Sequence, residues 1–234
     1  MDFWKKYIVF DTETPFSDMD MGIFMSIGAT KVGILEDKRT LVYIDRNNKP
    51  IEVFNEETKA YDNIPVVYMT WIDHSIQLSA SDERLIREFV GFVDEPIIGW
   101  NSIKYDIAKV NTRAMKFGIP TLDAKKSIDL MLKLKKTLSL HSFSLANVIK
   151  TFHTPEQTKC IIRRITDKSP IQSGYRIDEV SDVYFNKSGL PPDVWIDGLR
   201  YDKELRAIVH HNAIDVVLTS YLFSLALQKS LLLL

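Results

Sequence analysis

The sequence contains a single cysteine, Cys160, among its 234 residues. One cysteine excludes disulfides within the chain and zinc sites built from several thiolates, and it suits a reducing compartment such as the cytoplasm. Basic residues are not in excess either, because 30 Lys and Arg accompany 31 Asp and Glu, which gives a formal net charge of −1. The chain therefore lacks the positive field of a tight nonspecific nucleic-acid binder, and any attraction to phosphate must be local.

Long apolar runs are also missing. No stretch approaches the length of a membrane span, and the first apolar run, Tyr7 to Phe10, is too short for a signal peptide. The composition still supplies a core, since 45% of the residues are hydrophobic, and we expect one domain over residues 1–234. A loop-rich insertion is expected at about 155–198, where prolines and polar residues interrupt each apolar run. The terminal Leu231–Leu234 either packs on the core or docks a partner.

The segment KYIVFDTET, residues 6–14, joins a buried strand to two acids. Tyr7 to Phe10 is β-branched and aromatic, as is typical of a strand buried on both faces. Because side chains alternate along a strand, Asp11 and Glu13 are expected on one face. Two buried carboxylates repel each other unless a cation lies between them. The segment therefore indicates a metal site.

The remaining pattern predicts an α/β protein. Strands at Gly22 to Val32 and Thr40 to Ile44 would complete an antiparallel meander with the first strand, with a turn at residues 45–48. The other expected elements are a short helix at Asn55 to Tyr61, a helix at Asp82 to Val93 capped by Ser81, a strand at Pro96 to Trp100, a helix from about Lys104 to Phe117 ending at Gly118, and a long helix at Lys203 to Gln228. This order predicts a mixed β-sheet layered with helices.

Two further acids lie where the pattern predicts burial. Asp106 lies in the first turn of the helix after the strand Pro96 to Trp100, and Asp215 lies between Ile214 and Val216 in the long helix. Taken singly, Asp106 also suits a first-turn acid that complements the helix dipole, and Asp215 also suits an exposed stripe. Together with Asp11 and Glu13 they indicate a shared cationic partner.

Three ordered motifs resemble the DEDD superfamily of 3′–5′ exonucleases, which are DnaQ-like enzymes with a ribonuclease H-like fold. The motifs are FDTET, IIGWNSIKYD and HHNAIDVVLTSYLF, at residues 10–14, 97–106 and 210–223. Three segments between the second and third motifs, RAMKFGIP, SIDLML and LHSFSLANVIKTF, are most similar to the exonuclease domains of family B DNA polymerases and their stand-alone relatives.

The resemblance implies a ribonuclease H-like mixed sheet, a three-strand antiparallel meander plus parallel strands, flanked by helices. It also implies two Mg²⁺ or Mn²⁺ ions as cofactors. Asp11 would bridge both ions, Glu13 and Asp215 would hold one, and Asp106 would bind the other mostly through water. The implied reaction is hydrolysis of phosphodiester bonds from the 3′ end of single-stranded or frayed nucleic acid, DNA favoured over RNA, with release of nucleoside 5′-monophosphates.

The third motif leaves the catalytic histidine open. In the His-type branch the histidine precedes the last acid by five residues, which is His210, and we favour it. In the Tyr-type branch a tyrosine precedes that acid by four residues, and here His211 takes its place. The implied substrate contacts are Thr12 and Thr14 in the first motif, with Asn101 and Tyr105 in the second.

Several alternatives remain. The same fold and metals suit a structure-selective endonuclease, and an inactive copy would be a non-catalytic nucleic-acid-binding module. A homo-oligomer or a replication or repair partner is equally open. Basic clusters at Lys125, Lys126, Lys133, Lys135, Lys136, Arg163 and Arg164 either follow a phosphate backbone or are solvated faces. The apolar residues Phe16, Met19, Met21 and Phe24 either stack on a terminal base or belong to the core.

Overall fold

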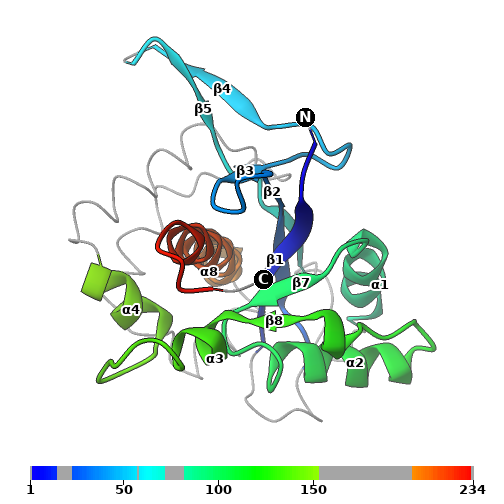
Figure 1. Cartoon of the computed structure of the whole chain (residues 1–234). Helices are drawn as coiled ribbons and strands as arrows, with labels where there is room; N and C mark the ends of the chain where they lie inside the picture. Colours follow the sequence, from blue (N-terminus) through cyan, green and yellow to red (C-terminus); the bar gives the residue numbers. More distant parts are fainter. Residues whose placement is uncertain (1, 15–22, 57, 72–81, 153–201, 233–234) are drawn as a thin grey trace.

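The computed structural model describes residues 2–14, 23–56, 58–71, 82–152 and 202–232, and Figure 1 shows their arrangement. The elements are β1 (Lys5–Glu13), β2 (Ser26–Ile34), β3 (Leu41–Tyr43), β4 (Glu52–Asn55), β5 (Ala60–Asn63), β6 (Tyr68–Trp71), α1 (Glu83–Phe92), β7 (Ile97–Gly99), α2 (Asp106–Lys116), a 3-10 turn (Ala124–Lys126), β8 (Ile128–Asp129), α3 (Leu130–Leu134), α4 (Leu145–Phe152) and α8 (Asp202–Gln228). The expected insertion at 155–198 lies outside the described residues. None of the described helices has both the length and the apolar character needed to cross a membrane.

The main sheet is mixed and has β1 at its centre. Its strand order is β3-β2-β1-β7-β8, and β6 also pairs with β2. The β1–β2 and β2–β3 pairs are antiparallel, whereas the β1–β7 and β7–β8 pairs are parallel. The expected three-strand meander followed by parallel strands is therefore confirmed, and with it the ribonuclease H-like α/β class.

Helices cover both faces of this sheet, with α8 on one face and α1 and α2 on the other (Figure 1). On β1, the Tyr7 ring meets Phe223 of α8 at a centroid distance of 5.7 Å, and the Phe10 ring stacks on Phe89 of α1 at 5.2 Å. Odd-numbered side chains of β1 thus point to α8 and even-numbered ones to α1 and α2. Asp11 and Glu13 share the α8 face, as the alternation predicts.

The predicted short helix at Asn55 to Tyr61 is wrong. The strands β4 and β5 pair there as an antiparallel hairpin, with Phe54 opposite Tyr61 and their ring centroids 5.3 Å apart. The polar residues between the two strands offer no apolar face at helical spacing, so they turn the chain while the two flanking rings pair across the strands.

Other expectations about the elements are tested in part. The helices predicted at Asp82 to Val93 and Lys104 to Phe117 exist as α1 and α2, and Gly118 ends α2 with a φ of 64°. The proposed cap Ser81 lies outside the described residues, and Asp82 occupies the position before α1. In the terminal Leu231–Leu234, Leu232 is buried and Leu231 packs on the core, while the last two residues lie outside the described ranges.

Asp82 and Arg113 form a buried ion pair that ties α1 to α2. Arg113 Nε lies 3.1 and 3.0 Å from the two Asp82 oxygens, and the backbone N–H of Phe24 donates to Asp82 Oδ2 at 2.9 Å. Both charged side chains are nearly inaccessible to solvent. Through Phe24, the pair also anchors the residues that precede β2. Met25, the next residue, is hydrogen-bonded to Glu13 at the end of β1.

Replacing Arg113 by Leu is expected to lower the free energy of unfolding by about 3 kcal/mol, because it leaves the Asp82 carboxylate buried without its cation. Denaturant titration at pH 7 measures the loss. The control is Arg87→Leu, which removes an exposed pair with Glu83 and should cost no more than about 1 kcal/mol. Equal losses in the two variants would contradict the assigned role.

Candidate active site

The end of β1 lies against α8, where Asp11 and Glu13 meet three residues of the helix. Asn212 is fully buried, and its Nδ2 donates a hydrogen bond of 2.9 Å to Asp11 Oδ2. His211 and Asp215 are four residues apart on α8, so they lie on one side of the helix. The third motif is therefore placed directly over the first.

His211 lies between two carboxylates. Its Nε2 is 3.7 Å from Glu13 Oε1 and 3.6 Å from Asp215 Oδ2. One ligand atom from each of these three residues lies within 4.8 Å of the others. The side chains of His211, Glu13 and Asp215 are 19%, 13% and 20% exposed, so the cluster is sheltered yet reachable from solvent.

Asp106 approaches the same strand end from the opposite face of the sheet. It is the first residue of α2, and the hydroxyl of Thr12 donates a short hydrogen bond to its Oδ1. Thr12 has an even number, so its side chain points away from α8 and toward the α2 side of β1. The end of β1 therefore has Asp106 on one face of the sheet and Asp215 of α8 on the other.

Burial and mutual repulsion act together on these acids. Burial, followed by the charges of Asp106, Asp215 and Glu13, raises the pKa of Asp11 well above its ordinary value, while the Asn212 hydrogen bond opposes the rise. Burial, then Asp215 and Asp106, raises the pKa of Glu13 in the same way. Burial also raises the pKa of Asp106 from 3.8 to about 7 despite the hydrogen bond from Thr12.

A divalent cation fits this donor set. Oxygen ligands from carboxylates are those that Mg²⁺ and Mn²⁺ prefer, and the nearby imidazole offers a nitrogen. A cation would also relieve the repulsion that raises the carboxyl pKa values. The structure places Asp11, Glu13, Asp106 and Asp215 at one strand end. Their roles as ligands remain predictions.

The other predicted site residues have different settings. The side chain of His210 lies outside the described residues, so the structure leaves the choice between the two histidines open. The Tyr105 side chain is 43% exposed, with the Lys104 ammonium 5.2 Å from its ring centroid. Thr14 follows β1 directly, and Asn101 has a positive φ of 57° in the loop before α2. Their contacts with substrate remain predictions.

Sequence reasoning missed the buried Asp129. Its carboxylate accepts hydrogen bonds from the backbone N–H groups of Asn101 and Ile103, at 3.2 and 3.3 Å, and from that of Leu132 at 3.1 Å. It thereby holds the loop that leads to Asp106, and its charge adds to the rise in the Asp106 pKa. The available signal was an acid between two apolar residues of the segment SIDLML.

Asn212 and Gly28 were missed as well. Gly28 pairs directly with Asp11 across β1 and β2, and a Cβ built there would lie 2.5 Å from Asn212 Oδ1 and 2.8 Å from Met69 Sδ. A glycine inside a strand pattern is the signal for such a close approach. The missing side chain leaves the space in which Asn212 reaches Asp11.

Gly28→Ala is therefore expected to lower the free energy of unfolding by about 2 kcal/mol, because the new methyl group overlaps Asn212 and Met69. Denaturant titration measures the change. The matched control is Gly91→Ala, since a Cβ at this position of α1 meets nothing within 4 Å. If the two substitutions have the same effect, the close packing of α8 on Gly28 is not important.

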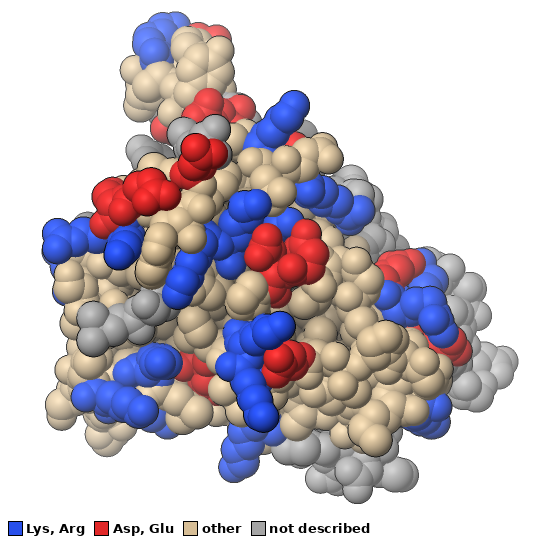
Figure 2. All heavy atoms as spheres, turned by 45° about the vertical axis from the view of Figure 1, so that its right-hand side comes forward, with Lys and Arg blue, Asp and Glu red and all other residues tan. Residues whose placement is uncertain are grey.

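The predicted basic clusters are exposed where the structure describes them. Lys125, Lys126, Lys133, Lys135 and Lys136 are all on the surface, whereas Arg163 and Arg164 lie outside the described residues. On the face that Figure 2 shows, Lys and Arg side chains are interspersed with Asp and Glu. Of the apolar residues after the first motif, Phe24 is fully buried and belongs to the core. Phe16, Met19 and Met21 lie outside the described residues.

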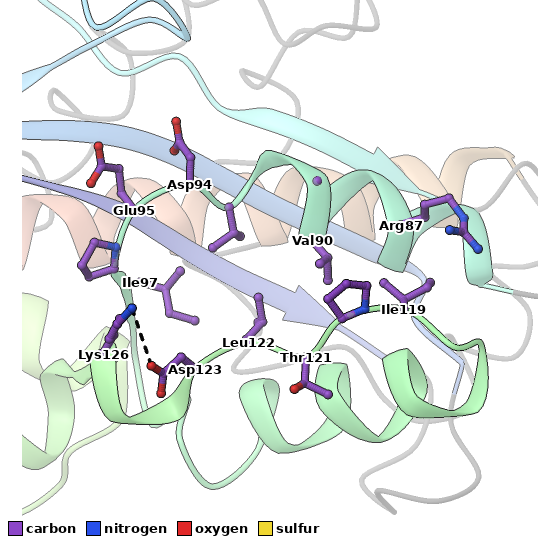
Figure 3. Close-up of a pocket in the computed structure, with 14 residues that line it drawn as sticks. Arg87, Val90, Asp94, Glu95, Ile97, Ile119, Thr121, Leu122, Asp123 and Lys126 are labelled. Atoms are coloured by element: carbon purple, nitrogen blue, oxygen red, sulfur yellow. Dashed lines mark ion pairs between the residues drawn. The ribbon is translucent and has the colours of Figure 1, made fainter.

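A separate cavity of about 790 Å³ lies between α1 and the segment that leads from α2 to the 3-10 turn. Figure 3 shows Val90, Ile97, Ile119 and Leu122 around it, with an ion pair between Lys126 and Asp123 at its rim. The cavity contains none of the four acids of the strand end. It is therefore separate from the candidate metal site.

Comparison with known proteins shows a likeness in fold alone. No protein-family model and no curated protein matches the sequence. The structure of the family B DNA polymerase from the hyperthermophilic archaeon Pyrobaculum calidifontis matches 95% of this chain with a TM-score of 0.54 and 13% sequence identity. This chain covers 24% of that polymerase.

Two structures of E. coli exonuclease I are also similar, one zinc-bound with single-stranded DNA and one with a dT13 oligonucleotide. They match 96% and 95% of this chain, each with 10% identity and a TM-score of 0.41, and this chain covers 41% of each.

Proposed function

We propose that this chain is a metal-dependent 3′–5′ exonuclease that hydrolyses phosphodiester bonds of single-stranded or frayed nucleic acid. The observation that carries the proposal is the convergence at one strand end of acids from β1, α2 and α8, with His211 between two of them. The likeness in fold to a family B DNA polymerase supports it.

In this proposal the four acids divide two metal ions between them. Asp11 lies centrally and would bridge two ions, Glu13 and Asp215 would hold the ion on the α8 side, and Asp106 would serve the other ion mostly through water. Two bound Mg²⁺ or Mn²⁺ ions would lower the pKa of the attacking water and stabilise the leaving 3′ oxygen. Asn212 and Thr12 keep Asp11 and Asp106 in place by hydrogen bonds.

The proposed substrate is a 3′ end, with DNA favoured over RNA, and the products are nucleoside 5′-monophosphates. The exposed ring of Tyr105 and the neighbouring Lys104 offer an aromatic face and a positive charge to an incoming strand. Thr12, Thr14 and Asn101 are the other proposed contacts. A histidine of α8, His210 or His211, would accept the proton of the attacking water.

The wider assignments remain proposals. We place the protein in the cytoplasm and treat residues 1–234 as one exonuclease domain with an insertion at about 155–198. A homo-oligomer or a replication or repair partner is compatible with this assignment.

Digestion of 5′-labelled oligonucleotides tests the function. Single-stranded and double-stranded DNA and RNA are incubated with Mg²⁺, Mn²⁺ or EDTA, together with a circular single-stranded DNA. We expect a ladder of shortened 5′-labelled products with either ion, no cleavage in EDTA and an intact circle. Cleavage of the circle would indicate an endonuclease, and the absence of any cleavage with either ion would favour a non-catalytic nucleic-acid-binding module.

A further inference from the structure

The position of His211 between Glu13 and Asp215 indicates a nitrogen ligand in the proposed metal site. Its Nε2 lies 3.7 Å from Glu13 Oε1 and 3.6 Å from Asp215 Oδ2. Two ligand atoms bound at about 2.1 Å to one ion lie roughly 3.0 Å apart at a right angle and roughly 3.6 Å apart at 120°. The imidazole nitrogen thus has the spacing of a third ligand atom.

The surrounding packing sets the position of the helix that carries His211. His211 and Asp215 are one helical turn apart on α8, and Glu13 faces them from β1. The neighbouring Asn212 is hydrogen-bonded to Asp11, and its amide packs over Gly28. Rotation of α8 would break this hydrogen bond, so packing sets the helix position that places His211 beside Glu13.

We infer that His211 Nε2 is a direct ligand of the ion held by Glu13 and Asp215, so that this subsite selects a first-row transition ion over Mg²⁺. The inference rests on the proposed function, because it concerns the same metal site. Imidazole is a good ligand for transition ions, whereas Mg²⁺ takes oxygen ligands and retains its water. The subsite around Asp11 and Asp106 offers carboxylates instead, so the two ion positions differ in chemistry.

This assignment also separates the two neighbouring histidines. An Nε2 lone pair that binds a metal is not available to accept a proton. His211 would then position the ion and would not accept the proton of the attacking water.

Pulsed electron paramagnetic resonance with Mn²⁺ alone tests the inference, because electron spin-echo modulation detects a nitrogen bound directly to Mn²⁺. The wild-type chain is compared with His211→Gln, with His211→Asp and with the neighbouring control His210→Gln. The Asp variant restores a ligand through oxygen, so it keeps a metal site even if the Gln variant binds Mn²⁺ too weakly to be measured. Calorimetric titration with Mn²⁺ and with Mg²⁺ gives the selectivity of each variant.

We expect nitrogen modulation in the wild type and in His210→Gln, and its loss in both His211 variants. The preference for Mn²⁺ over Mg²⁺ should fall by roughly tenfold in His211→Asp. The inference is overturned if the wild type shows no nitrogen modulation, if the modulation disappears in His210→Gln, or if His211→Asp keeps the wild-type selectivity. These readouts need no substrate, so an inactive chain that binds Mn²⁺ through His211 would refute only the proposed function.

Discussion

Asp11→Asn is expected to reduce 3′-end cleavage by roughly a thousandfold or more, since the proposed function makes this carboxylate a ligand of both ions. The substitution keeps the size of the side chain. It also keeps an oxygen that can accept the hydrogen bond from Asn212 Nδ2. The fold should therefore survive while the charge that holds the ions is lost.

Single-turnover digestion of a 5′-labelled oligonucleotide with saturating Mn²⁺ measures the effect. The control is Asp37→Asn, which changes an exposed acid in the turn after β2, where its partners are Arg39 and Thr40. Its rate should equal that of the wild type. A cleavage rate for Asp11→Asn within about tenfold of the wild type would remove Asp11 from the reaction, and with it the two-metal proposal.

The metal-free protein is expected to lose stability as the pH rises from 5 to 8, with a fall in melting temperature of roughly 10 °C. The folded-state pKa of Asp106 is about 7 against an ordinary 3.8, and those of Asp11 and Glu13 are raised as well. The folded protein therefore binds more protons than the unfolded chain between these values. The stabilisation is complete below about pH 4 and is lost as the pH rises through 7.

For Asp106 alone the shift corresponds to a free-energy change on the order of 4 kcal/mol. Thermal melts in EDTA across this pH range measure the effect, and Asp106→Asn is the comparison, because it keeps the acceptor for Thr12 but cannot ionise. At pH 8 the Asn variant should melt above the metal-free wild type, and saturating Mn²⁺ should reverse the order. If the two proteins have parallel pH profiles in EDTA, Asp106 is not held in a buried, repulsive site.

Hydrophobic alternation and apolar composition within one segment predicted the elements that have a clear buried face. The alternation along β1 placed Asp11 and Glu13 on one face, and that face is the one that α8 covers. The continuous apolar character of the long helix predicted α8 within one residue of its observed start. In contrast, β6, β8 and α3 are too short for a periodic signal, so sequence reasoning did not find them.

The hairpin of β4 and β5 shows why local propensity was misleading. The residues between Asn55 and Tyr61 suit a helix by composition, but the pairing of Phe54 with Tyr61 decides the structure. Cross-strand contacts join residues that are separated in sequence, so the composition of one short segment does not reveal them.

By itself, the sequence determined β1, α2, α8 and the acids that each of them carries, because these depend on alternation and periodicity within one segment. Only the tertiary structure decided which groups meet. It brought Asp106 through Thr12 to the strand end, set His211 between Glu13 and Asp215, and used Gly28 to admit Asn212. The physical reason is that these meetings depend on how α2 and α8 pack across the sheet, and packing is a property of the whole core rather than of any one segment.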